Sequence, residues 1–175
     1  MLACKARAQV AIDILVRNLF ERTADVGFLA ADDAICKFCR DAPALKAVIG
    51  DGGEEAAGAI RTLQMAREAI QRRLAEYVAK YSVYNNVVLV APNGEVLAQL
   101  AGGKAPEHTQ DDLIDATLAS SMPYVESFAT SDLVPDARRA LIYAHRVTYK
   151  GDTVAVLCPV LQARGRVHGH LRQAA

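Results

Sequence analysis

Cys36 and Cys39 have the CxxC spacing found in zinc sites and in thiol redox sites. A zinc site needs two further ligands, which typically come from a second such pair, and Cys4 and Cys158 are isolated. A redox motif of this kind follows a strand in a βαβ unit, which the surrounding pattern does not predict. Cysteines three residues apart on a short helix usually face a core as small apolar side chains. We therefore expect structural cysteines and no metal, with a thiol redox sensor as the less favoured alternative.

Motifs of catalysis and of cofactor binding are not evident elsewhere in the chain. The GDGG segment 50–53 lacks the spacing of a phosphate-binding loop, and no GxSxG occurs. Asp111 and Asp112 fit the start of a helix, where carboxylates interact favourably with free backbone N–H groups. Nothing around His108 or His145 favours haem ligation. We expect a protein that is not an enzyme and that has no cofactor.

Polar side chains on two predicted strands are the candidates for binding a small molecule. Alternation places Tyr143 and His145 on one side of their strand, and Tyr124 and Glu126 share a side of the strand before it. Tyr143 and His145, helped by Tyr124, could supply polar contacts inside an apolar cup.

Arg146 offers a different mode of binding on the opposite side of the same strand. Its guanidinium group could hold both oxygens of a carboxylate ligand. Alternatively, the tyrosines have partners within the protein and Arg146 lies at a solvated edge. The sequence leaves open which face of the sheet holds a ligand.

Composition limits the class of partner. The chain has 175 residues, 52% of them hydrophobic, with 20 basic and 20 acidic side chains. Hydrophobic content of this size predicts a folded globule, and the charge balance gives no basis for binding nucleic acid or an anionic membrane. No run spans a bilayer and no signal-peptide layout precedes the fold, so the sequence as written predicts a soluble, cytoplasmic chain.

The positions of apolar residues and of turn residues predict three helices followed by a mostly β region. We expect helices over residues 5–28, 32–41 and 54–80, a shorter helix after Thr109, and strands over 87–90, 95–100, 124–128, 140–149 and 153–158. Pro43 should stop the second helix, and Pro159 should end the last strand.

The turn at 91–94 is predicted from single residues. Pro92 presets φ at the first central position, and Gly94 can take the left-handed conformation that closes a hairpin. Short connections of this kind predict an antiparallel sheet, and the long helices must bury their apolar stripes against one of its faces. The fold class is therefore α+β: a PAS-like five-stranded antiparallel sheet packed on long N-terminal helices.

One domain is expected, in three stretches. Residues 1–50 hold the long N-terminal helix and the short helix, and residues 51–161 hold the sensor-like sheet with its leading helix. Residues 162–175 form a tail rich in Arg, Gly and His with no periodicity.

Four segments resemble the Cache family, the sensor domains of bacterial chemoreceptors, histidine kinases and diguanylate cyclases. They are LAEYVAKYSVYNNVVLVAPNGEVLAQL, PYVESF, RRALIYAHRVTYKGDTVAVLCPV and NLFERTADVGFLA. The resemblance implies a small-molecule-sensing domain of a bacterial signal transduction protein, one that signals through its N-terminal helix. It also implies a homodimer through the N-terminal helices and a place outside the cytoplasm in a membrane receptor, unlike the cytoplasmic expectation above.

The ligand is not specified by this resemblance. The amino-acid-binding members use an Arg-Trp-Tyr signature, and this chain has no Trp. The expected ligand is an organic acid or an amine. The alternative function is a scaffold or dimerisation module that binds no ligand.

Overall fold

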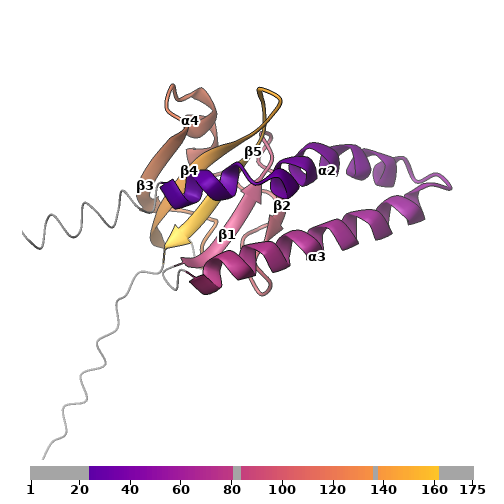
Figure 1. Cartoon of the computed structure of the whole chain (residues 1–175), viewed down its shortest axis with the longest axis horizontal. Coiled ribbons are helices and arrows are strands. Elements are labelled where there is room, and N and C mark those ends of the chain that lie inside the picture. The colour runs from indigo at the N-terminus through magenta and orange to yellow at the C-terminus, as the bar shows by residue number, and fades with distance from the viewer. Residues whose placement is uncertain (1–23, 81–83, 136–137, 162–175) are drawn as a thin grey trace, which may run out of the picture.

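The computed structural model describes residues 24–80, 84–135 and 138–161, and in this part of the chain two long helices lie on one face of a sheet (Figure 1). Residues 24–30 are helical and lead into α2. The labelled elements are α2 (Asp33–Asp51), α3 (Ala56–Lys80), β1 (Tyr84–Val90), β2 (Val96–Gln99), α4 (Leu113–Ala119), β3 (Tyr124–Thr130), β4 (Arg139–Tyr149) and β5 (Asp152–Leu161).

The five strands form one antiparallel sheet in the order β2-β1-β5-β4-β3. The last described strand, β5, pairs with β1 on one side and with β4 on the other, so it lies at the centre of the sheet. The predicted fold class is confirmed: the protein is α+β, with a five-stranded antiparallel sheet consistent with a PAS-like fold and helices at its N-terminal end.

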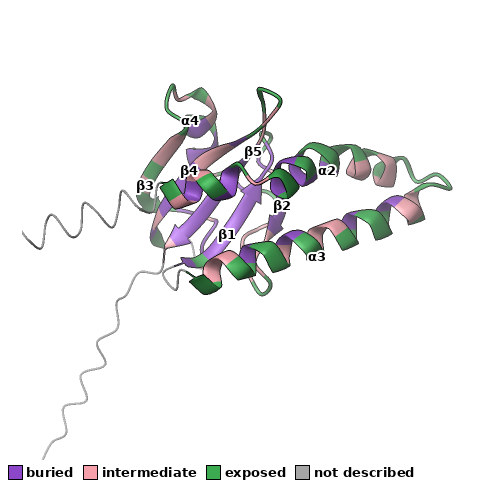
Figure 2. Ribbon diagram, in the orientation of Figure 1, coloured by how far each residue is buried: buried purple, intermediate pink, exposed green. Residues whose placement is uncertain are grey.

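Two apolar cores lie on the two faces of the sheet, and the strands between them are largely buried (Figure 2). The helix face of the sheet packs against α2 and α3. Its buried strand residues are Tyr84, Val87, Leu89, Leu97, Ala98, Tyr143, Val147, Ala155 and Leu157. The α4 face packs against α4 and the loop after β3. Its buried strand residues are Val88, Val90, Ala140, Ile142, Ala144, Val156, Cys158 and Val160.

Helix α2 begins where the sequence predicts and ends later. The Asp32 carboxylate accepts hydrogen bonds from the N–H groups of Ala34 and Ile35, at 3.0 and 3.3 Å, which caps the helix start. The prediction that Pro43 stops the helix is wrong, because Pro43 lies inside α2. Apolar side chains before and after Pro43 pack into the same core, and this packing outweighs a cost of about 3 kcal/mol for an interior proline.

The prediction that Pro159 ends the sheet is also wrong. Pro159 lies in the central strand β5, opposite Val87 of β1. On its other side, β5 pairs with β4 at His145–Leu157 and again at Ile142–Val160. Cys158 and Pro159 lie between these two pairs. Pro159 has no N–H to donate, and the apolar faces of β5 keep the strand in the sheet across this gap.

Other boundaries shift by a few residues. Strand β1 starts at Tyr84, before the predicted Val87, and α4 has seven residues where about ten were expected. Most of the predicted helix over 5–28 and the whole tail 162–175 lie outside the described residues.

The β1–β2 turn confirms its prediction. The N–H of Gly94 donates to the carbonyl of Ala91 at 2.9 Å, and Gly94 has φ of 88°. The N–H of Ala91 then donates to Glu95 at 2.7 Å, which closes the hairpin. The 107–109 segment lies against this turn, because Thr109 donates its N–H to the carbonyl of Gly94 at 2.9 Å.

We expect Gly94→Ala to lower the free energy of unfolding more than Gly151→Ala. Both glycines have positive φ, 88° and 96°, so either alanine costs about 1–2 kcal/mol of backbone strain. A Cβ at position 94 would lie 2.8 Å from both His108 Cε1 and Thr109 O, whereas nothing lies within 4 Å at position 151. The overlap should add roughly 1–3 kcal/mol. Urea denaturation measures both losses, and equal losses would contradict close packing at this turn.

Candidate ligand-binding site

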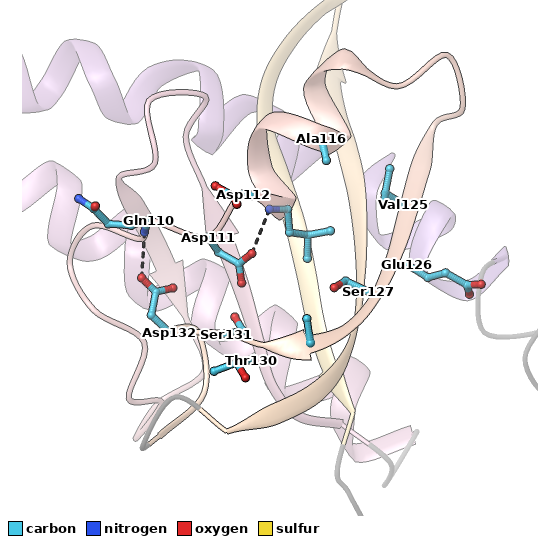
Figure 3. A pocket seen from close by; sticks show the side chains of 12 residues that line it. Gln110, Asp111, Asp112, Ala116, Val125, Glu126, Ser127, Thr130, Ser131 and Asp132 are labelled. Atoms are coloured by element: carbon cyan, nitrogen blue, oxygen red, sulfur yellow. Dashed lines mark hydrogen bonds between the residues drawn. The ribbon is translucent and has the colours of Figure 1, made fainter.

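A cavity of about 570 Å³ lies on the α4 face of the sheet, next to β3. It is bounded by the segment before α4, the first turns of α4, β3 and the loop after β3 (Figure 3). Leu113, Ala116, Val125 and Ala129 give it apolar walls. Its polar lining consists of Gln110, Asp111, Asp112, Glu126, Ser127, Thr130, Ser131 and Asp132. The volume lies within the range of small-molecule sites, and the cavity is open to solvent, because Gln110, Asp112 and Ala129 of its lining are exposed.

Hydrogen bonds join the two loops that border the cavity. The Asp132 carboxylate accepts the N–H of Gln110 at 2.8 Å and the hydroxyl of Thr109. The Thr109 hydroxyl in turn accepts the N–H of Asp111 at 3.1 Å, and Asp111 accepts the N–H of Leu113 at 2.9 Å. These bonds hold the loop after β3 against the start of α4, so the cavity has a fixed rim (Figure 3).

The cavity lining is acidic. Asp111, Asp112 and Asp132 line it, and no Lys, Arg or His is among the described residues at its wall. Burial raises the pKa of the Cys158 thiol on the same face of the sheet, and the charge of Asp111 adds to this effect. Several carboxylates on one surface attract cations and repel anions. This lining suits an amine better than an organic acid.

Four of the five predicted binding residues have their side chains on the other face of the sheet. Tyr143 is 1% exposed within the helix-face core. His145 and Tyr124 form a cross-strand pair, so their side chains share the helix face with Tyr143. The ring Nδ1 of His145 lies 2.8 Å from the carbonyl of Arg146, and its Nε2 lies 3.5 Å from where a Cβ on Gly27 would be. The His145 ring therefore packs beneath the helical residues 24–30.

Glu126 and Arg146 lie nearer the cavity. Glu126 borders it, but it pairs with Tyr143 across β3 and β4, so its exposed side chain lies on the helix face and points away from Asp111 and Ser127 (Figure 3). Arg146 faces the α4 side, opposite to Tyr143 and His145 as alternation predicts, and its Nη1 donates to the carbonyl of Ser120 at 2.8 Å. Ser120 is the C-cap of α4, so Arg146 holds the end of this helix against β4.

Residues of the cavity that sequence reasoning missed come from loops. The sequence predicts only helix capping for Asp111 and Asp112, and it predicts no role for Ser131 and Asp132. A signal was present: Ser131-Asp132 lies in the loop that follows the predicted strand 124–128, a place where polar side chains often bind ligands. That these residues lie opposite Asp111 could not be read from the sequence.

The CxxC cysteines are buried on α2. Cys39 is 1% exposed, and burial raises its pKa to about 12. Burial also raises the pKa of Cys36, with a smaller contribution from Asp32, and the Cys36 thiol lies 3.4 Å from the carbonyl oxygen of Ala30. Reactive cysteines have lowered pKa values and exposed sulfur atoms, so this arrangement favours structural cysteines.

In the described parts of the chain, no group of three or more His, Cys, Asp or Glu side chains is arranged to hold a metal ion. Within the same residues, no helix combines the length and the apolar character needed to cross a membrane. Searches of models of known protein families and of curated protein sequences give no match to this chain.

We expect Cys36 and Cys39 to react slowly with a disulfide reagent such as DTNB in the native protein. Because the pKa of Cys39 is about 12, raising the pH from 8 to 10 should leave its thiol protonated, whereas an exposed thiol would ionise over this range. The measurement is the rate at which a Cys4→Ser variant reacts with the reagent, in buffer and in urea. Labelling should be slow in buffer and fast in urea. Fast labelling in buffer would restore the redox interpretation.

Proposed function

We propose that this protein is a small-molecule-sensing domain whose ligand is a small amine, bound in the acidic cavity on the α4 face. The observation that carries the proposal is the position of the cavity. It lies on the sheet face opposite the long helices and has a polar rim contributed by two separate loops. A ligand there would contact the start of α4 and β3 together, so it would favour the arrangement in which both are in place.

The choice of an amine rests on charge. An ammonium group donates hydrogen bonds and interacts favourably with carboxylates, and Asp112 makes no side-chain capping bond of its own at the start of α4. An organic acid would meet like charge at Asp111, Asp112 and Asp132.

A route for the signal runs through adjacent residues of β4. Arg146 bonds to the end of α4 on one face, and its neighbour His145 packs beneath Gly27 on the other face. A displacement of α4 would thus reach helical residues 24–30, the N-terminal part of the described chain. Coupling between such sites typically amounts to about 1–3 kcal/mol. The homodimer through the N-terminal helices stays a prediction, since residues 1–23 lie outside the described chain.

Thermal unfolding with added ligands tests the proposal. A diamine such as 1,4-diaminobutane should raise the unfolding temperature, and succinate at the same ionic strength should not. Saturation at about 100 times Kd should add about 2.7 kcal/mol, which corresponds to several degrees for a domain of this size.

Asp112→Asn should reduce the shift given by the diamine, because it removes one charge at the cavity and no capping bond. Asp51→Asn, at the far end of α2, is the matched control and should leave the shift unchanged. If neither probe stabilises the protein, the sensing proposal is wrong and a scaffold that binds no ligand is favoured.

A further inference from the structure

Strand β3 forms an edge of the sheet that no described element covers. The other edge strand, β2, has partners outside the sheet: Val96 N–H donates to Glu107 O at 2.8 Å, and Arg67 Nε donates to Leu97 O at 3.0 Å. On β3, by contrast, the side chains of Glu126 and Phe128 are exposed, the latter at 65%. Lys and Pro, which commonly protect edge strands, do not occur in β3.

The hydrogen bonds between β3 and β4 show which backbone groups of β3 point outward. Arg146 N–H donates to Pro123 O at 3.0 Å, and Ser131 N–H donates to Arg138 O at 3.3 Å, at the two ends of an unbroken register. In an antiparallel pair the bonded residues alternate, so the odd-numbered residues of β3 bond to β4. The N–H and C=O groups of the even-numbered residues therefore face the open edge: Tyr124, Glu126, Phe128 and Thr130.

We propose that β3 pairs with β3 of a second copy of this chain, antiparallel and about a two-fold axis at Ser127. This register sets Tyr124 opposite Thr130 and Glu126 opposite Phe128, so all four outward-facing residues of each strand find a partner. An axis at Glu126 would place two carboxylates opposite each other, and an axis at Glu126 or at Phe128 would leave outward-facing groups of each strand unpaired.

The side chains fit the same register. Directly opposite residues share a face, so the aliphatic part of Glu126 would cover the ring of the partner's Phe128. The two Phe128 rings would be diagonal neighbours across the axis, within reach of each other. The exposed apolar ring is thereby removed from water by the second copy, and the two sheets become continuous.

Two variants of opposite charge at one position test the register. Phe128→Lys places a cation opposite Glu126 of the second copy. Phe128→Glu instead places a carboxylate opposite Glu126, and the two-fold axis repeats this repulsion at a second, equivalent pair. Sedimentation velocity of the full chain should show a dimer for the wild type and for Phe128→Lys. For Phe128→Glu it should show dissociation, with Kd raised about tenfold or more.

Met65→Glu is the matched control, because Met65 is 71% exposed on α3 and should not affect the dimer. A wild-type chain that sediments as a monomer overturns the proposal, whether the edge is then free or covered by the chain's own termini. A dimer that both Phe128 variants leave intact, or that both dissociate equally, overturns it as well.

Cross-linking gives a second readout. In a Cys4→Ser background, Ser127→Cys should form a disulfide-linked dimer under mild oxidation, because the two residues face each other across the axis as a non-hydrogen-bonded pair. Ala129→Cys is the control on the same strand. Its two copies would lie roughly 13 Å apart, too far for a disulfide. Equal cross-linking of the two variants, or none, contradicts the register.

Discussion

The pairing of the last strand at the centre of the sheet is the constraint on which the other features depend. Residues Ala155 to Val160 are all buried, because β5 has strands on both sides and a core on each face. A strand in this position must be apolar on both faces, and this one keeps its place even with a proline that cannot donate a hydrogen bond. Helices α2 and α3 then cover one face of the sheet and α4 covers the other, and each face supplies its own set of apolar strand residues.

The two faces divide structure from function in the proposed mechanism. Tyr143 and both cysteines of the CxxC motif are buried on the helix face, so these side chains are part of the packed core. The α4 face is covered by a short helix and loops, which leave a cavity beside β3. Because α4 has only seven residues and depends on Arg146 and on loop contacts, it is the described element best suited to respond to a ligand.

The edges of the sheet differ for a related reason. Strand β2 is four residues long and lies beneath α3 and the 105–109 segment, which use its outward groups. Strand β3 is longer and serves two environments at once, since its odd-numbered side chains line the cavity and its even-numbered backbone groups face outward. A partner on this edge would therefore stiffen one wall of the cavity.

The sequence by itself determined the fold class, the order of elements and the β1–β2 turn, because these follow from local periodicity and from the conformations open to Pro92 and Gly94. It also determined that Arg146 lies opposite Tyr143 and His145, since alternation along a strand is local. Only the tertiary structure decided which face the helices cover, and this placed Tyr143 in the core and the half-buried His145 beneath residues 24–30. It likewise decided that Pro43 and Pro159 are tolerated and that Asp132 lies beside Gln110. Each of these depends on packing or hydrogen bonding between distant segments, whose energies outweigh local preference and leave no local pattern in the chain.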